Sequence, residues 1–102
     1  MSRISEIEAE RDAALSEIDH NYRDQQNAYE QEKEQINSRA AEKQSNGEDI
    51  SAEVKENDEV NAKQDKRFDE YEADRAETWD KYQNQIDEAQ QEEQGEEEDY
   101  GY

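Results

Sequence analysis

Residues 40–54 read AAEKQSNGEDISAEV, and this stretch holds the only clear turn signal in the middle of the chain. Gly47 can adopt the left-handed backbone conformation that ends a helix, and Asp49 or Ser51 can cap a helix that follows. Long stretches rich in Ala, Glu, Gln, Lys and Arg, which favour helix, flank this turn. We therefore expect helices at about residues 3–44, with Ser2 or Ser5 as the cap, and at about 49–93, joined by a turn at 45–48.

Apolar side chains recur at helical spacing on both sides of the turn. In the first stretch the steps keep one face apolar through Ile4, Ile7, Leu15, Ile18, Tyr22, Tyr29 and Ile36. In the second stretch we predict a stripe through Ile50, Val54, Asn57, Asn61, Gln64, Phe68, Tyr71, Arg75, Trp79, Tyr82, Ile86 and Ala89. Several of these residues recur every eleven positions, a period that keeps a stripe nearly straight.

The two stretches are nearly equal in length, so folding at Gly47 brings residue i opposite roughly residue 94 − i. The pairs predicted to face each other are Ile7 with Ile86, Leu15 with Trp79, Tyr22 with Tyr71, and Ala40 with Val54. We therefore predict an all-α protein, a long antiparallel coiled-coil-like hairpin over residues 1–94. A flexible acidic C-terminal tail over 95–102 follows it. One continuous helical rod is the alternative.

The charge balance excludes several kinds of partner. The chain of 102 residues has 32 acidic and 12 basic residues, a net charge of −20. Nucleic acids and anionic lipids attract cationic surfaces, so we expect neither direct nucleic-acid binding nor membrane docking. No long apolar run or secretory signal occurs. We expect a protein of the cytoplasm or one incorporated in a virion.

Catalytic and metal-binding patterns are weak. Glu17 and His20 have the Glu-x-x-His spacing of di-iron helical bundles. Ile18, however, lies on the inward face of the predicted helix, and at this spacing Glu17 and His20 point away from that face. There is no Cys, no phosphate-binding loop, no EF-hand loop and no Ser/His/Asp set. We therefore expect no enzyme, cofactor or metal site.

The candidate functional residues are those of the stripe. They either pack between the helices or form an exposed row of anchors for a protein partner, and Tyr and Trp suit both roles. The candidates are Ile7, Leu15, Ile18, Tyr22, Tyr29, Phe68, Tyr71, Trp79, Tyr82 and Ile86. The polar positions 25–26 and 57–64 are expected to set the helix register through hydrogen bonds. In the tail, Glu96, Glu97, Glu98 and Asp99 are expected to reach a basic patch or to repel negatively charged neighbours.

The hairpin has few large apolar side chains to bury, and both of its helices carry an excess of negative charge. We therefore expect that self-association or a larger partner completes the fold. Size, hairpin form and lack of Cys are similar to the W-x-G hairpins of bacterial type VII export, although the turn reads Ser45-Asn46-Gly47 and Trp79 lies deep in the second stretch. The composition resembles small assembly proteins of tailed phages. We therefore expect a structural or assembly protein, such as a component of a phage virion or of its assembly. The alternative is an acidic nucleic-acid mimic that blocks a basic DNA- or RNA-binding protein.

Overall fold

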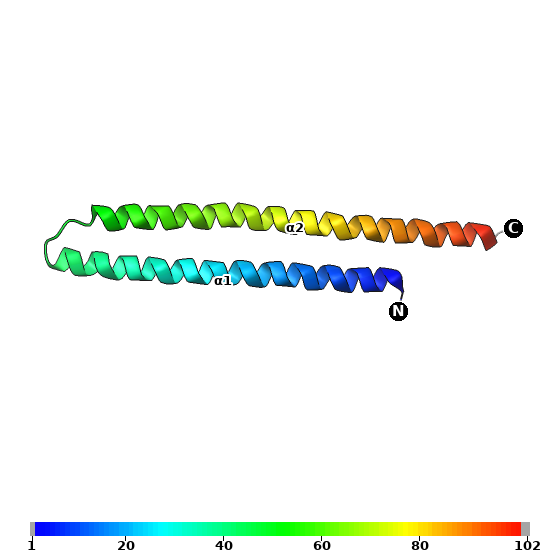
Figure 1. Cartoon of the computed structure of the whole chain (residues 1–102), viewed down its shortest axis with the longest axis horizontal. Coiled ribbons are helices and arrows are strands. Elements are labelled where there is room, and N and C mark those ends of the chain that lie inside the picture. Colours follow the sequence, from blue (N-terminus) through cyan, green and yellow to red (C-terminus); the bar gives the residue numbers. More distant parts are fainter. Residues whose placement is uncertain (1, 101–102) are drawn as a thin grey trace. The chain divides into compact units, whose positions relative to one another are not determined.

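The computed structural model describes residues 2–100, with side chains over residues 2–93. Two helices, α1 at Arg3–Ser45 and α2 at Ser51–Tyr100, are joined by a short turn (Figure 1). The chain is thus an all-α helical hairpin of the coiled-coil kind, as predicted. Neither helix, over its described residues, contains an apolar stretch that could cross a membrane.

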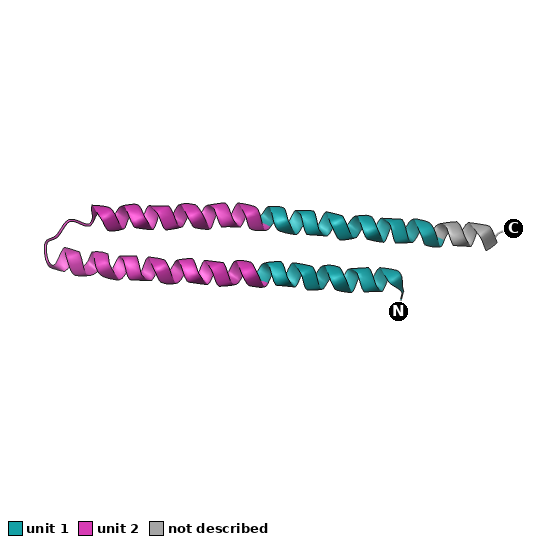
Figure 2. Cartoon of the chain, viewed as in Figure 1, with its two compact units in different colours: residues 1–19, 72–102 teal, residues 20–71 magenta. Residues whose placement is uncertain are grey.

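The hairpin divides into two compact units, and each combines a segment of α1 with a segment of α2 (Figure 2). Unit 1 comprises residues 1–19 and 72–102, and unit 2 comprises residues 20–71. The core of unit 1 is formed by Ile7, Ile86 and Ala89, with Ile4 and Tyr82 packed against it. The predicted pairing of Ile7 with Ile86 is therefore confirmed.

Helix α1 begins at a serine cap. The backbone N–H of Ser5 donates to the side-chain oxygen of Ser2 at 3.1 Å, and the N–H of Glu6 donates to the Ser2 carbonyl at 3.1 Å. A side chain that accepts an otherwise unpaired amide stabilises the first helical turn. Of the two predicted candidates, Ser2 is the cap and Ser5 lies inside the helix.

Gly47 ends α1 as the sequence predicts. Its φ angle is +72°, the left-handed conformation that side chains disfavour. The N–H of Glu48 donates to the Lys43 carbonyl at 2.8 Å, and the N–H of Gly47 donates to the Gln44 carbonyl at 3.1 Å. This pair of bonds is the Schellman pattern, which satisfies carbonyls left open at the end of a helix.

Helix α2 begins at Ser51, two residues after the start predicted from Asp49. The amide and hydroxyl of Ser51 both donate to the Asp49 carboxylate, at 3.3 and 2.8 Å, so Asp49 stabilises this terminus from outside the helix. These bonds, the hydroxyl first, lower the pKa of Asp49 below its usual value.

At its other end α2 extends to Tyr100, beyond the predicted end near residue 93. Gln and Glu favour helix, and the cost of one Gly such as Gly95 is modest. The side chains of the acidic run Glu96–Asp99, and all of residues 101–102, lie outside the described residues. The flexibility of the tail remains a prediction.

Replacing Gly47 with Ala should lower the free energy of unfolding by about 1 kcal/mol, because an L side chain disfavours the left-handed conformation. No atom lies within 4 Å of the place that the new methyl group would take, so no clash adds to this cost. Urea unfolding followed by circular dichroism measures the loss. Gly47→Asn is the control, since Asn tolerates this conformation better and should lose less. Equal stability of all three proteins would contradict this account of the turn.

Candidate functional site

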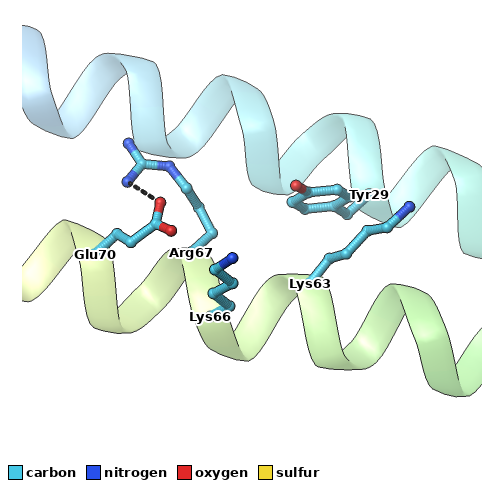
Figure 3. A pocket seen from close by; sticks show the side chains of 5 residues that line it. All are labelled: Tyr29, Lys63, Lys66, Arg67 and Glu70. Carbon is cyan, nitrogen blue, oxygen red and sulfur yellow. Dashed lines mark ion pairs between the residues drawn. The ribbon is translucent and has the colours of Figure 1, made fainter.

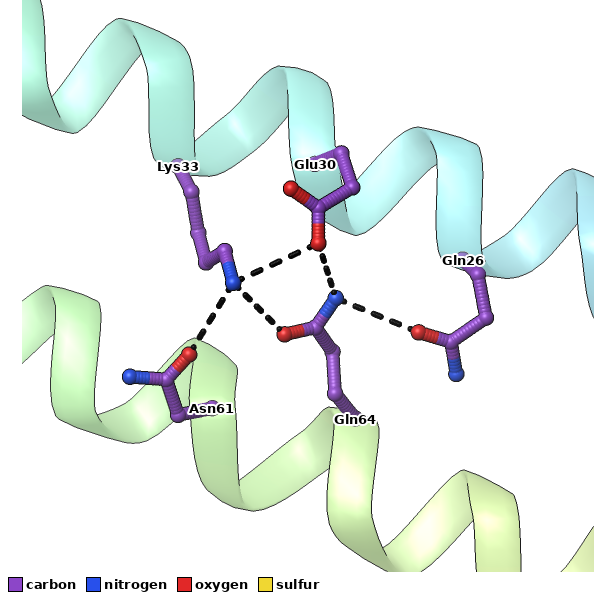
Figure 4. A network of polar contacts seen from close by, with 5 residues as sticks. All are labelled: Gln26, Glu30, Lys33, Asn61 and Gln64. Carbon is purple, nitrogen blue, oxygen red and sulfur yellow. Dashed lines mark hydrogen bonds and ion pairs between the residues drawn. The ribbon is translucent and has the colours of Figure 1, made fainter.

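A polar network joins the two helices of unit 2 (Figure 4). The Gln64 side-chain amide donates to Gln26 Oε1 at 3.1 Å and to Glu30 Oε1 at 2.8 Å. The Lys33 ammonium donates to Gln64 Oε1 at 2.9 Å and to Asn61 Oδ1 at 3.2 Å. The bonds from Gln64 and then Lys33 hold the pKa of Glu30 below its usual value. The predicted hydrogen bonding of the polar middle is thus present, and its control of register stays a prediction.

A buried carboxylate lies near the turn in unit 2. Glu53 is 2% exposed and forms an ion pair with Lys43, whose side chain is 38% exposed. The hydrogen bond from Lys43 lowers the pKa of Glu53, and the same bond raises the pKa of Lys43. Burial of a carboxylate is costly unless it is paired, so Lys43 is what allows Glu53 to lie between the helices.

Aromatic rings form a second contact in unit 2. The rings of Tyr22 and Tyr71 stack with their centroids 4.1 Å apart and an angle of 19° between their planes. The predicted pairing of these two residues is therefore confirmed. The ring of Phe68 lies at the edge of this stack, 6.3 Å from Tyr22, and remains 44% exposed. Such ring pairs stabilise a contact beyond their buried area.

Unit 1 contains the tryptophan. Trp79 is 46% exposed, and the guanidinium of Arg11 lies 4.5 Å from its ring centroid in a cation–π contact. Leu15, which was predicted to face it, is buried at 8% exposure. An ion pair between Arg75 of α2 and Asp19 of α1 also joins the helices of this unit.

The predicted site residues fall into three groups. Ile7, Leu15 and Ile86 are buried; Ile18, Tyr22, Tyr29, Tyr71 and Tyr82 are half-buried; Phe68 and Trp79 are exposed. Phe68 and Trp79 are thus about half exposed, although each contacts α1, through Tyr22 and Arg11 respectively. Their role as anchors for a partner stays a prediction. Val54, which the folding at Gly47 placed opposite Ala40, is 52% exposed.

The predicted stripe of α2 is off by one residue at four positions, whereas Tyr71, Tyr82 and Ile86 are buried or half-buried as predicted. At three places a polar residue lies inward and the large apolar residue directly after it lies outward; these inverted pairs are Glu53–Val54, Arg67–Phe68 and Thr78–Trp79. One residue turns a helix by about 100°, so this small offset decides which side chain faces α1. The prediction also named Asn61 where Val60 is buried, at 2% exposure.

A signal for the inward positions was present in the sequence. Asn57, Gln64, Tyr71 and Thr78 follow each other at seven-residue steps, and all four are half-buried. A strict seven-residue spacing is typical of a coiled-coil seam. The predicted stripe includes Asn57, Gln64 and Tyr71, and it departs from this spacing at Thr78, where it names the larger, apolar Trp79.

His20 lies on the surface of unit 2, where its Nε2 is 3.3 Å from the Asp24 carboxylate and its side chain is 70% exposed. Within the described residues, no group of three or more His, Asp or Glu side chains gathers in a way that could hold a metal ion.

No protein-family model matches the chain, and searches of curated proteins and of solved structures returned no significant match.

Replacing Glu53 with Gln should destabilise the hairpin near pH 7, because Lys43 then loses its counter-charge. The folded-state pKa of Glu53 lies below its usual value near 4.5, so the ionised group stabilises the fold fully above that value. Its contribution is lost as the pH falls through the lower folded-state pKa. The difference in Tm between wild type and Glu53→Gln should therefore be largest near neutral pH and shrink in acid.

Thermal unfolding at a series of pH values measures this difference. The exposed Glu59→Gln is the control, because it changes the net charge equally without touching the buried pair. A difference in Tm that stays the same at about pH 7 and about pH 3 would show that the charge of Glu53 is not what stabilises this contact.

Proposed function

We propose that this chain is a non-enzymatic structural or assembly protein. In this proposal it associates with further copies or with a larger protein partner through the outward apolar residues of α2, namely Val54, Phe68 and Trp79. The compositional likeness to phage assembly proteins favours a large assembly such as a virion as its setting.

The inverted pairs are the observation that carries the proposal. Single exposed apolar residues are common on monomeric proteins and need no explanation. Here, however, an exposed Val54 follows a buried Glu53, and an exposed Phe68 follows Arg67, whose side chain is only 16% exposed. A hairpin that was stable through its own apolar contacts would have the opposite arrangement.

The positions of these residues fit a larger bundle. An apolar residue directly after an inward position lies at the edge of the seam between two helices. In bundles of three or more helices this edge is buried by the next helix. Val54 and Phe68 are fourteen residues apart in unit 2, so they recur at the same edge position of the seven-residue pattern.

The acidic mimic is less well supported. A mimic needs carboxylates that are free to meet a basic cleft, whereas several carboxylates here pair with cations of the same chain. Glu53 pairs with Lys43, and Glu56 lies 2.6 Å from Arg39. These pairs interrupt an array that would copy nucleic-acid phosphates.

The triple variant Val54→Ala, Phe68→Ala and Trp79→Ala tests the proposal. Ala has the highest helix propensity, and these side chains are about half exposed, so the helix content should be retained. Self-association should weaken by at least about tenfold, because burying large apolar side chains stabilises an interface by ~1–3 kcal/mol each. Light scattering in line with size exclusion, over a hundredfold range of concentration, measures the effect.

Ile7→Ala is the contrasting variant, because Ile7 is 3% exposed and its truncation should reduce the stability of the hairpin itself. Measurements at high salt distinguish an assembly protein from a nucleic-acid mimic. Apolar association persists or tightens at high salt, whereas the binding of a mimic to a basic protein weakens. A triple variant that associates as tightly as the wild type would contradict the proposal.

A further inference from the structure

A small basic groove lies on unit 2. It has a volume of about 230 Å³ and is lined by Tyr29 of α1 and by Lys63, Lys66, Arg67 and Glu70 of α2 (Figure 3). The ring of Tyr29 forms one wall, and the basic side chains form the other. We call these five residues the basic groove.

The groove contrasts with the charge of the whole chain. Three of the 12 basic residues fall within residues 63–67, although the net charge is −20. Arg67 lies 3.8 Å from Glu70 and also donates to Gln25 of α1. Lys63 and Lys66 are exposed, and neither forms an ion pair with another residue in the described part of the chain. The five lining residues carry three positive charges and one negative charge, and the exposed ammonium groups of Lys63 and Lys66 are the charges that an anionic ligand can meet.

We propose that the basic groove binds the acidic C-terminal segment, residues 92–99, of a second copy of the chain. This segment has six carboxylates in eight residues, namely Glu92, Glu93, Glu96, Glu97, Glu98 and Asp99. Its charge is complementary to that of the groove. The inference rests on the proposed function, because it names one of the contacts through which copies associate.

The acidic segment that fills the groove comes from a second copy, because within one copy a single helix contains both the acidic segment and the charged residues of the groove. The charged residues of the groove and the acidic segment belong to the same continuous helix, Ser51–Tyr100. A segment of a continuous helix does not fold back onto that helix. The acidic segment therefore meets a basic groove on another copy.

The proposed contact determines how two associating copies are oriented. Exposed ion pairs contribute little to affinity one by one, whereas complementary charges orient two surfaces and exclude other arrangements. At physiological salt, charges beyond about 8 Å are largely screened, so the overall repulsion between two acidic copies is reduced while touching pairs still attract. The outward apolar residues then supply adhesion, and the groove determines which end of a neighbour binds.

Two full-length charge-reversal variants test the inference. The groove variant has Lys63→Glu and Lys66→Glu, and the segment variant has Glu97→Lys and Glu98→Lys. Glu and Lys have similar helix propensities, so helix content should not change. Each substitution changes the charge by two, so the net charge goes from −20 to −24 in the groove variant and to −16 in the segment variant.

Sedimentation velocity, with one partner carrying a fluorophore, measures how tightly each protein associates. Each variant alone should associate about tenfold more weakly than the wild type. The equimolar mixture of the two variants should regain wild-type affinity, because the acidic segment of one meets the intact groove of the other. These differences should disappear at about 1 M salt.

Repulsion between the net charges of two copies, acting alone, predicts a different order of affinities. If only net charge mattered, the segment variant would associate more tightly than the wild type and the mixture would be intermediate between the two variants. The matched control is Arg23→Glu with Lys55→Glu, which gives the same net charge as the groove variant at exposed positions outside the groove. This control should weaken association less than the groove variant does.

The outcomes separate the two proposals. An oligomeric wild type together with a segment variant that associates as tightly as the wild type, or a mixture that is merely intermediate, would overturn this inference alone. A wild-type chain that remains monomeric at every concentration would overturn the inference and the self-association part of the proposed function, and only binding to a larger protein partner would then be left of that function.

Discussion

The pairing of α1 with α2 through polar side chains is the contact on which the rest of the structure depends. In unit 2, Gln64 and Lys33 connect the helices by hydrogen bonds, and Lys43 pairs with the buried Glu53. Only 28% of the chain is apolar, and Val54, Phe68 and Trp79 are exposed, so polar side chains occupy part of the inward positions. Hydrogen bonds between polar groups require particular partners, which makes such a seam specific, while its net contribution to stability per bond is small.

The polar residues at inward positions also determine which side chains of α2 are exposed. Because Glu53, Arg67 and Thr78 take inward positions, the apolar residues that follow them are left exposed on α2. Long side chains such as Arg67 can lie along an apolar neighbour with their stems while their charged ends reach polar groups. The same offset leaves an apolar surface on α2, and this is the surface that the proposed partner would cover. Proteins commonly have such departures from the most stable arrangement at functional sites.

The sequence predicted the fold because the fold depends on strong local signals. Gly47 in a polar turn and long runs of helix-forming residues indicate two helices of similar length, and the pairing of Tyr22 with Tyr71 follows from simple folding at the turn. The inward positions of α2 were predicted only in part: Tyr71, Tyr82 and Ile86 are buried or half-buried, whereas Val54, Phe68 and Trp79 are exposed. Apolar spacing alone places the more apolar residue of a turn inside, and an offset of one residue reverses that assignment. The buried position of Glu53 depends on Lys43, ten residues away along the chain, which no local pattern in α2 contains.

Trp79 is the only tryptophan, so its fluorescence reports directly on the central claim that the apolar side of α2 is covered by a partner copy. The measurement is acrylamide quenching of Trp79 over a dilution series, with helix content recorded on the same samples. The account predicts that quenching increases on dilution, because dissociation uncovers a ring that is 46% exposed in the single chain. It also predicts that this change precedes any loss of helix. Quenching that is independent of concentration, in samples that remain helical, would contradict the account.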